Sequence, residues 1–333
     1  MTRPSACLAL AAALFVAACN DNPTATDQST PAPAAAFARK AINRKAINTG
    51  GSAVVLLNRV NLALAARHAK YRVDHAEWVT RGNGEQAGQI VFAKDRGNKQ
   101  LPFQFVPFDP RRGEGREITY LVDRSDGATH AGTPLTNAAT EAAIDREMNT
   151  WETTTTCSKF PIVKVADNGA DPDVMDGIVF NDPSLLGTPF ADYTHAGWYP
   201  AGFFDALAPY GSTFILGVTF TFFFADDGGN PTDINHDGKG DAAFRETYYN
   251  DAFEWGIDTD NSDAIDVETV ALHESGHGLS QAHFGRIFGT LSNLRLHFAP
   301  QAVMNDAISI QKHSLLGSDQ GGHCSIWGNW PNK

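Results

Sequence analysis

The chain has 333 residues and a formal net charge of −12, and its 42% hydrophobic and 19% charged residues are typical of a globular protein. The charge is unevenly divided, because residues 39–116 hold 15 Lys and Arg against 6 Asp and Glu, whereas residues 117–333 hold 10 against 30. The acidic part would repel phosphate, which argues against nucleic-acid binding, and it would attract the basic part.

The N-terminus has the features of an export signal. Arg3 precedes an apolar run over residues 6–18, which is too short to span a bilayer as a helix. The run ends in Val-Ala-Ala-Cys19, which resembles a bacterial lipobox and implies that residues 1–19 are a lipoprotein signal with Cys19 as the acylated mature N-terminus. The alternative is an ordinary secretory signal that is cleaved nearby. Both alternatives predict an extracytoplasmic protein, and the first adds a lipid anchor in the membrane of the cell envelope.

A tether and a small basic unit are expected next. Residues 20–38 are rich in Pro, Ala, Thr and Ser, which favours a flexible linker. In residues 39–116 the apolar pattern predicts a helix over 54–69 and strands over 71–79 and 89–93, and prolines between positions 102 and 110 mark a second linker. We interpret this basic N-terminal unit as either a prosegment or an accessory domain, which docks on the acidic remainder through its charge.

The pattern of residues 117–333 is that of an α+β domain. Apolar runs predict strands over residues 118–122, 160–165, 178–180, 214–224 and 245–249, and helical spacing predicts helices over 137–153 and from Asp266 onward. This order of elements indicates a twisted mixed sheet with helices packed on it. The apolar strand at 215–224 is either the edge to which an extended peptide adds or an interior strand.

The most informative motif is His273-Glu274-Ser275-Gly276-His277, followed after five residues by His283. On a helix, positions i and i+4 share one face, so His273 and His277 can present two imidazoles to one metal ion, with the Glu274 carboxylate beside them. His283 can return as a third nitrogen ligand if the chain turns sharply near Ser280. Three neutral nitrogens and one water are the ligand set of a catalytic zinc site.

These residues resemble the metzincins, and specifically the matrixin-like zinc metallopeptidases. The stretch 270–283 resembles the zinc helix and third ligand of that family, and Ala302-Val303-Met304 resembles its Met-turn, whose methionine packs beneath the metal. Two weaker similarities lie at 248–255 and 315–328. The resemblance covers about residues 117–333 and implies a five-stranded sheet, three main helices, one catalytic zinc held by His273, His277 and His283, and Glu274 as general base.

Two departures from the family pattern affect what the resemblance implies. Ser280 stands where the family usually has glycine, and serine would incur about 1 kcal/mol of strain if the left-handed turn is kept. No cysteine lies between Cys19 and Cys157, so latency through a prosegment thiolate on zinc is excluded. Residues 39–116 remain a prosegment held by charge or a spacer with a solvated basic face.

Cysteines and an acidic loop supply two further expectations. In an oxidising compartment Cys157 and Cys324 are expected to form a disulfide, the alternative being two separate buried thiols. The loop at 233–241 presents Asp233, Asn235 and Asp237, with Asp241 after two glycines, and resembles the start of a calcium loop. Its twelfth position is not Glu, so it is no complete EF-hand. The loop either binds Ca²⁺ or is a solvated acidic surface.

The sequence therefore predicts an exported zinc-dependent endopeptidase that hydrolyses peptide bonds of extracellular or envelope proteins, with Glu274 acting on metal-activated water. Two alternatives stay open. One is a non-catalytic surface lipoprotein that binds calcium or a partner, and the other is a zinc amidase that acts on cell-wall peptide. A purely structural metal site has no need of the carboxylate of Glu274, which distinguishes the first alternative.

Overall fold

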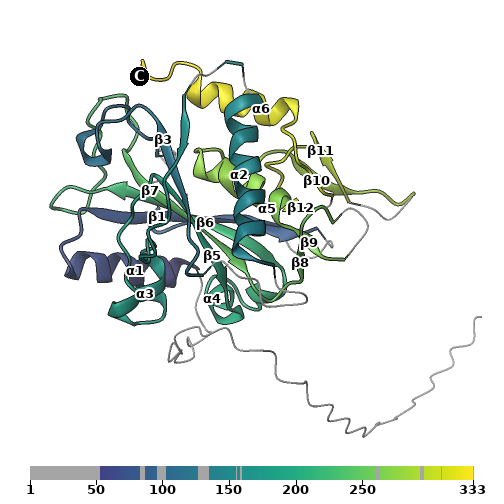
Figure 1. The fold of residues 1–333 in the computed structure, drawn as a ribbon, viewed down its shortest axis with the longest axis horizontal. Helices are drawn as coiled ribbons and strands as arrows, with labels where there is room; N and C mark the ends of the chain where they lie inside the picture. Colours follow the sequence, from purple (N-terminus) through teal and green to yellow (C-terminus); the bar gives the residue numbers. More distant parts are fainter. Residues whose placement is uncertain are drawn as a thin grey trace, which may run out of the picture. The chain divides into compact units, whose positions relative to one another are not determined.

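A mixed β-sheet of eight strands carries the fold in the described part of the chain (Figure 1). The computed structural model describes residues 53–82, 87–95, 103–126, 135–154, 156–157, 160–259, 263–292, 296–308 and 310–332. Its α-helices are α1 (Ala53–Ala66), α2 (Asn137–Thr154), α3 (Met175–Val179), α4 (Ala201–Asp205), α5 (Val267–Gly278) and α6 (Gly317–Trp327). Its strands are β1 (Tyr71–Arg81), β2 (Gln89–Phe92), β3 (Ile118–Val122), β4 (Ile162–Lys164), β5 (Tyr193–Tyr199), β6 (Ile215–Phe224), β7 (Ala242–Asn250), β8 (Trp255–Gly256), β9 (Ile265–Asp266), β10 (Arg286–Gly289), β11 (Leu296–Ala299) and β12 (Ala307–Ile308).

The strand order is β12-β1-β6-β7-β5-β3-β4, and β2 also pairs with β1. Strands β4, β3, β5 and β7 run parallel to one another, whereas β6 is antiparallel to both β7 and β1. Beyond β1, the sheet ends in the short strands β2, which is antiparallel to β1, and β12, which is parallel to it. The sheet is therefore mixed, as expected from the order of the elements.

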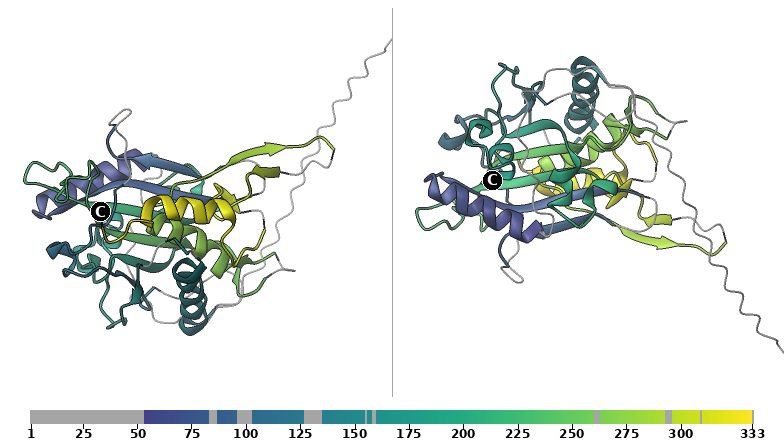
Figure 2. Two further views of the ribbon diagram at one scale, coloured as in Figure 1. Left: turned by 90° about the horizontal axis from the view of Figure 1, so that it is seen from above. Right: turned by 90° about the horizontal axis from the view of Figure 1, so that it is seen from below.

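The two faces of the sheet are covered by different helices. One apolar cluster contains Trp151 of α2, Val270 of α5 and Trp327 of α6. The other contains Leu57 of α1 and Phe203 of α4, together with buried residues of α3. The β10–β11 hairpin, which follows α5, projects beyond the sheet (Figure 2). The metal-site helix α5 thus packs on the face that α2 and α6 also cover.

A disulfide joins two of these helical regions. Cys157 lies just after α2 and Cys324 lies within α6, and their Cα atoms are 5.6 Å apart across 167 residues of chain. The structure therefore contains the bridge that the sequence led us to expect. It links the end of α2 to α6 on the face that holds α5.

The expectation that the basic N-terminal residues form a unit of their own does not hold for those described, which belong to one compact unit with the rest, whereas their role as a prosegment or an accessory domain stays a prediction. Strand β1 pairs with β6 from Tyr71 opposite Phe224 to Thr80 opposite Ile215, so it is an integral strand of the sheet. The sheet consequently has eight strands rather than five, because β1, β2 and β12 extend the edge at β6. The expected linker is also wrong, because Phe103 and Phe105 are buried in the core.

Two local predictions also fail. Residues 178–180, expected as a strand, belong to the end of α3, whose first turn is closed by the Asp173 carboxylate accepting from the N–H of Asp176. Strand β5 has no predicted counterpart, because parallel neighbours on both sides bury all seven residues and its polar and aromatic side chains give no clear period. Strand β3 has the predicted bounds, and the other strands and helices expected after residue 116 are present with ends shifted by a few residues.

Several expectations fall outside the described residues. The signal segment 1–19 with Cys19, the tether 20–38 and residues 39–52 belong to this part of the chain. No helix that the structure describes combines the length and apolar character required to cross a bilayer.

Candidate metal centre

Helix α5 positions two of the three histidines because both of its ends are fixed. At the start, the Asp266 carboxylate accepts hydrogen bonds of 2.8 and 2.7 Å from the N–H and the hydroxyl of Thr269, which caps the helix. After the helix, Ser280 has φ 71°, the left-handed conformation expected for the turn even without glycine. Its hydroxyl donates to the carbonyl of Phe103 at 3.3 Å. This turn brings His283 back towards the helix.

The three predicted ligands converge. The Nε2 atoms of His273 and His277 are 3.1 Å apart, and those of His277 and His283 are 3.2 Å apart. One nitrogen from each ring lies within 4.8 Å of the others. His273 and His277 are buried, and burial lowers the pKa of His273 well below its usual range and that of His283 to about 3. Both shifts favour the neutral imidazoles that a metal ion requires, whereas the Glu77 carboxylate outweighs burial and raises the pKa of His277.

The hydrogen bonds of the rings show that this arrangement suits a cation. The Nδ1 atoms of His273 and His277 each lie 2.7 Å from a backbone carbonyl oxygen, that of Val303 and that of Gln281. A carbonyl only accepts, so each Nδ1 carries the proton and each Nε2 presents a lone pair. Lone pairs that face one another at about 3 Å repel unless a cation lies between them. Neutral nitrogens fixed in this way are the ligands that zinc prefers.

Glu274 follows His273 in helix α5, and its carboxylate is hydrogen-bonded to groups of two strands, β6 and β1. Its Oε2 accepts from the Thr219 hydroxyl of β6 at 2.6 Å, and the carboxylate also accepts from the backbone N–H of Val79 in β1. A side chain at Gly217 would meet the carboxylate at 2.9 Å, so glycine leaves the space it occupies. Burial raises the pKa of Glu274 to about 7, a value suited to a group that takes and returns a proton near neutrality.

Met304 lies against the zinc helix, as the resemblance implies. A Cβ at Gly276 would collide with the Met304 sulfur, so the close approach of the two segments requires glycine in the helix. The turn that carries Met304 is held by the buried Asp319 of α6, whose two carboxylate oxygens accept from the N–H groups of Val303 and Met304 at 2.9 and 3.1 Å. Residues far apart in the sequence thus form the floor of the site.

Sequence reasoning missed three ionisable residues near this site, all from β1. Glu77 Oε2 lies 3.3 Å from His277 Nδ1 and 3.2 Å from His75 Nε2, and His75 Nδ1 lies 2.7 Å from Asp74. Burial alone would raise the pKa of Glu77, but the two imidazoles hold it well below its usual range. No local signal identifies these residues, because β1 reaches the site through pairing with a strand about 140 residues later.

Thr219 was missed as well, although the sequence holds a signal for it. In the apolar strand β6, alternate positions are occupied by Gly217, Thr219 and Thr221. The Thr219 hydroxyl donates to the Glu274 carboxylate, and the Thr221 hydroxyl accepts from the Arg245 guanidinium. Small and polar residues at every second position mark one face of a strand that contacts a polar site. The other face, with Val218 and Phe220, packs in the core.

The predicted calcium loop does not bring its four residues together. The carboxylate of Asp241 is buried and accepts from the Arg111 guanidinium at 2.8 Å, which competes with a metal ion, so its assignment as a calcium ligand is wrong. Asp233 accepts from the N–H groups of Asp237 and Gly238, and Asn235 donates to Asp237. A role of Asp233, Asn235 and Asp237 in binding calcium stays a prediction.

A second acidic group was not foreseen. Carboxylate oxygens of Asp123, Asp126 and Asp173 lie within 4.8 Å of one another near the ends of β3 and β5. Asp173 accepts from the hydroxyls of Tyr199 and Tyr248, and burial raises its pKa well above the usual range. The donors at the Asp173 carboxylate are therefore supplied by the protein itself.

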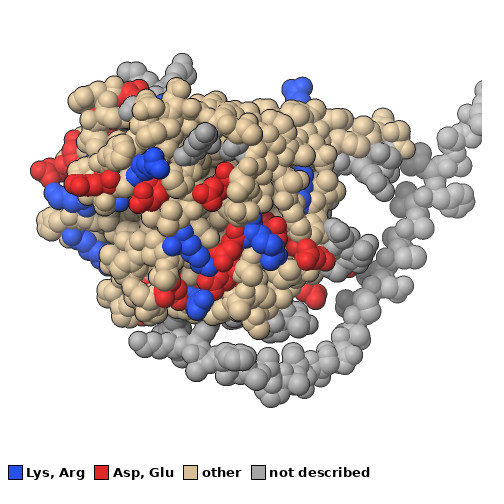
Figure 3. Space-filling model, turned by 45° about the horizontal axis from the view of Figure 1, so that its top comes forward, with Lys and Arg blue, Asp and Glu red and all other residues tan. Residues whose placement is uncertain are grey.

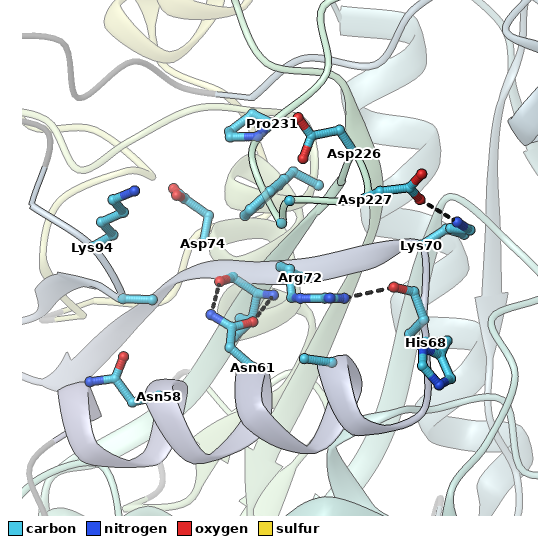
Figure 4. A pocket seen from close by; sticks show the side chains of 17 residues that line it. Asn58, Asn61, His68, Lys70, Arg72, Asp74, Lys94, Asp226, Asp227 and Pro231 are labelled. Atoms are coloured by element: carbon cyan, nitrogen blue, oxygen red, sulfur yellow. Dashed lines mark hydrogen bonds and ion pairs between the residues drawn. The ribbon is translucent and has the colours of Figure 1, made fainter.

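One cavity lies away from the three histidines and another borders them. A cavity of about 540 Å³ is lined by residues of α1, the start of β1 and the loop after β6, including Asn61, Arg72 and Asp226 (Figure 4). A smaller one, about 300 Å³, is lined by His75, Glu77 and His277 and borders the metal centre. Basic and acidic side chains are interspersed on the face seen in Figure 3.

The charge division of the sequence appears as ion pairs between neighbouring segments. Arg112 binds Asp192 at 2.6 Å, and Lys70 binds Asp227 at 2.8 Å. Comparisons with models of known protein families and with curated proteins find no match to this chain. The candidate site is therefore defined by its own geometry: three imidazole nitrogens that face one point, with a buried carboxylate beside them.

Proposed function

We propose that the chain is a zinc-dependent endopeptidase. The observation that carries this proposal is the convergence of His273, His277 and His283 through nitrogens whose lone pairs face one point, with Glu274 adjacent and not a ligand. A purely structural zinc site is closed by four protein ligands, whereas three ligands leave one position for water or substrate. The ligand count therefore supports catalysis over a structural role.

The chemistry divides between the metal and the protein. When bound, zinc supplies a Lewis acid that lowers the pKa of its water towards 7 and polarises a carbonyl oxygen. Glu274 takes the proton that the attacking water gives up and returns it to the nitrogen of the leaving amine. A pKa raised to about 7 by burial suits both roles. The Thr219 hydroxyl, 2.6 Å from Oε2, holds the carboxylate in place between these two transfers.

The setting that we propose for this activity is outside the cytoplasm. Cys19, at the end of the apolar N-terminal run, would carry the lipid anchor, so the substrates would be extracellular or envelope proteins. The disulfide between Cys157 and Cys324 supports an oxidising compartment. Mass spectrometry of the mature protein tests this assignment, because acylation of Cys19 changes both the N-terminus and its mass.

The test of the activity uses the full chain loaded with zinc and incubated with casein. We expect cleavage by the wild type, none by His273→Ala, which loses a ligand, and none by Glu274→Ala with zinc still bound. Undiminished cleavage by Glu274→Ala would remove Glu274 from the mechanism. A wild type that binds zinc but cleaves neither casein nor gelatin would favour the binding lipoprotein, and cleavage of cell-wall peptide alone would favour the amidase.

A further inference from the structure

Strand β1 lies in a position that an extended peptide would otherwise occupy. It is antiparallel to β6 along nearly its whole length, and at its end Thr80 and Arg81 pair in parallel with Ala307 and Ile308 of β12. Without β1, strand β6 would be the exposed edge of the sheet, and its unpaired N–H and C=O groups would be free to bind another strand. The chain itself therefore fills the groove between β6 and β12.

The same strand crosses the catalytic groups. The backbone N–H of Val79 donates to the carboxylate of Glu274, and Glu77 lies 3.3 Å from His277 Nδ1. A side chain at Gly88, in the segment that turns back after β1, would meet His283 Cε1 at 3.0 Å. Glu274 and His273 are fully buried, and His277 is 1% exposed. A protein substrate has no access to these residues while β1 is in place.

We infer that β1 is a built-in occupant of the peptide-binding groove, so that hydrolysis requires the segment that carries α1, β1 and β2, residues 53–95, to leave β6. This inference rests on the proposed function, because it identifies the surface that binds the substrate of that same site. An extended peptide that replaced β1 would run antiparallel to β6. Its backbone would lie against Glu274 in the place of Val79.

The connectivity allows this departure. Residues 53–95 precede the other strands in the chain, and β1 can leave the sheet by losing its pairs with β6 and β12, while the order β6-β7-β5-β3-β4 stays intact. The disulfide lies outside this segment. The ion pair between Lys70 and Asp227 is solvent-exposed, and pairs of this kind contribute little to stability.

The packing shows that the departure is not spontaneous. Val73, Ala76 and Trp78 of β1 are buried in the apolar cluster that also contains α1, so leaving exposes a large apolar area. Because each Å² of buried apolar surface stabilises by about 25 cal/mol, burial of this area strongly favours the closed form, in which β1 stays paired with β6. A cut in the chain after β2 leaves these contacts intact but makes rebinding of the segment bimolecular, so that dilution or a competing partner can displace it. The uncut, closed form is therefore latent.

The experiment combines a cut with a reversible lock. A recognition sequence for a site-specific protease replaces residues 96–100 of the full chain. The lock is Ala76→Cys with Phe220→Cys, two residues that lie directly opposite in β1 and β6, where antiparallel Cα separations of about 4.5–5.5 Å suit a disulfide. Each single cysteine variant is the matched control, and Tyr71→Cys with Phe224→Cys is a second lock nearer the surface, should the first not fold.

Two rates are measured, extraction of zinc by 1,10-phenanthroline and hydrolysis of casein. After the cut we expect release of the segment, seen by size exclusion, and at least a tenfold rise in both rates. The cut protein that carries the engineered disulfide should keep the rates of the uncut protein until a phosphine reductant opens that disulfide. Cut single-cysteine variants treated with the same reductant control for reduction of the native disulfide.

The outcomes separate this inference from the proposed function. Release without a rise in the rate of zinc extraction would overturn the inference, and so would equal rates in locked and unlocked protein. Loss of folded structure on release, seen by circular dichroism, would also overturn it, because β1 would then be a permanent strand. If zinc extraction accelerates but no protein is cleaved, the groove assignment stands and the hydrolase proposal fails.

Discussion

Residues 53–95 and residues 103–332 share one sheet but make different contributions to the metal centre. The second region supplies the three histidines, Glu274, Thr219 and Met304, and the disulfide closes a loop within it. The first supplies β1, whose backbone and Glu77 contact these groups but offer no ligand to the point that the imidazoles face. A segment can therefore be fully part of a sheet and contact a candidate metal site without offering it a ligand.

The largest expected effect concerns the chemistry of the second region. Replacing Glu274 by Gln keeps the shape of the side chain and removes its capacity to take a proton, so kcat should fall by about 10²- to 10⁴-fold. Zinc content, measured by atomic emission, should not change. Glu268→Gln, on the same helix, is the matched control and should retain activity. Comparable losses in the two variants would contradict a specific role for Glu274.

Removal of the disulfide tests whether the second region is stabilised independently of the first. Replacing Cys157 and Cys324 together by Ser should lower the free energy of unfolding by about 2–5 kcal/mol. Hydrogen exchange should accelerate more in α2, α5 and α6 than in α1, because the bridge lies on the face that those three helices cover. Equal acceleration in α1 would argue that the two regions unfold as one unit.

Three ionisable residues of β1, Asp74, His75 and Glu77, predict how pH changes the stability that the first region contributes. Burial alone would lower the pKa of His75, but hydrogen bonds to Asp74 and Glu77 outweigh it and raise the pKa to about 9. The protonated ring therefore contributes stability, on the order of 3 kcal/mol, that is fully present below the unfolded pKa of about 6.5 and is lost as pH rises to about 9.

Urea unfolding of wild type and His75→Phe measures this contribution. The stability difference between the two proteins should be largest below about pH 6.5 and should shrink as the pH rises from 6.5 to about 9. A difference that does not change with pH would show that His75 acts through packing against Phe92 rather than through its charge.

The smallest expected effect concerns the turn at Ser280, which brings His283 back towards helix α5. Ser280→Gly and Ser280→Ala both remove the hydroxyl that donates to Phe103, so their difference isolates the backbone. Because φ is 71°, the glycine variant should be more stable than the alanine variant by about 1 kcal/mol, measured by thermal unfolding. Equal stabilities would indicate that the turn relaxes to another conformation.

The features that the sequence predicted well are those set by local spacing. The helical period places His273 and His277 on one face, the cap at Asp266 fixes the start of α5, and Ser280 adopts the left-handed turn despite its side chain. The position of β1 was not predictable in this way. Its alternation identifies a strand, but only pairing with β6 decides that it joins the main sheet, and charge composition suggested a separate unit.

Other parts of the site depend on tertiary contacts that leave weak sequence signals. Asp319 holds the Met304 turn from a helix that follows it, and Glu77 reaches His277 from about 200 residues earlier. Asp241 satisfies the spacing of a calcium loop, yet it is paired with Arg111, a partner that spacing within the loop does not reveal. The long-range ion pair with Arg111, rather than the spacing within the loop, therefore determines the environment of Asp241.

The central claim is that three imidazoles bind one zinc ion while Glu274 stays outside its ligand set. An anomalous difference map recorded at the zinc edge, from crystals of the zinc-loaded protein, tests it most directly. We predict one peak about 2.0–2.1 Å from the Nε2 atoms of His273, His277 and His283, with no carboxylate oxygen of Glu274 in direct contact. A peak that His283 does not touch, or no peak at this position, would contradict the account.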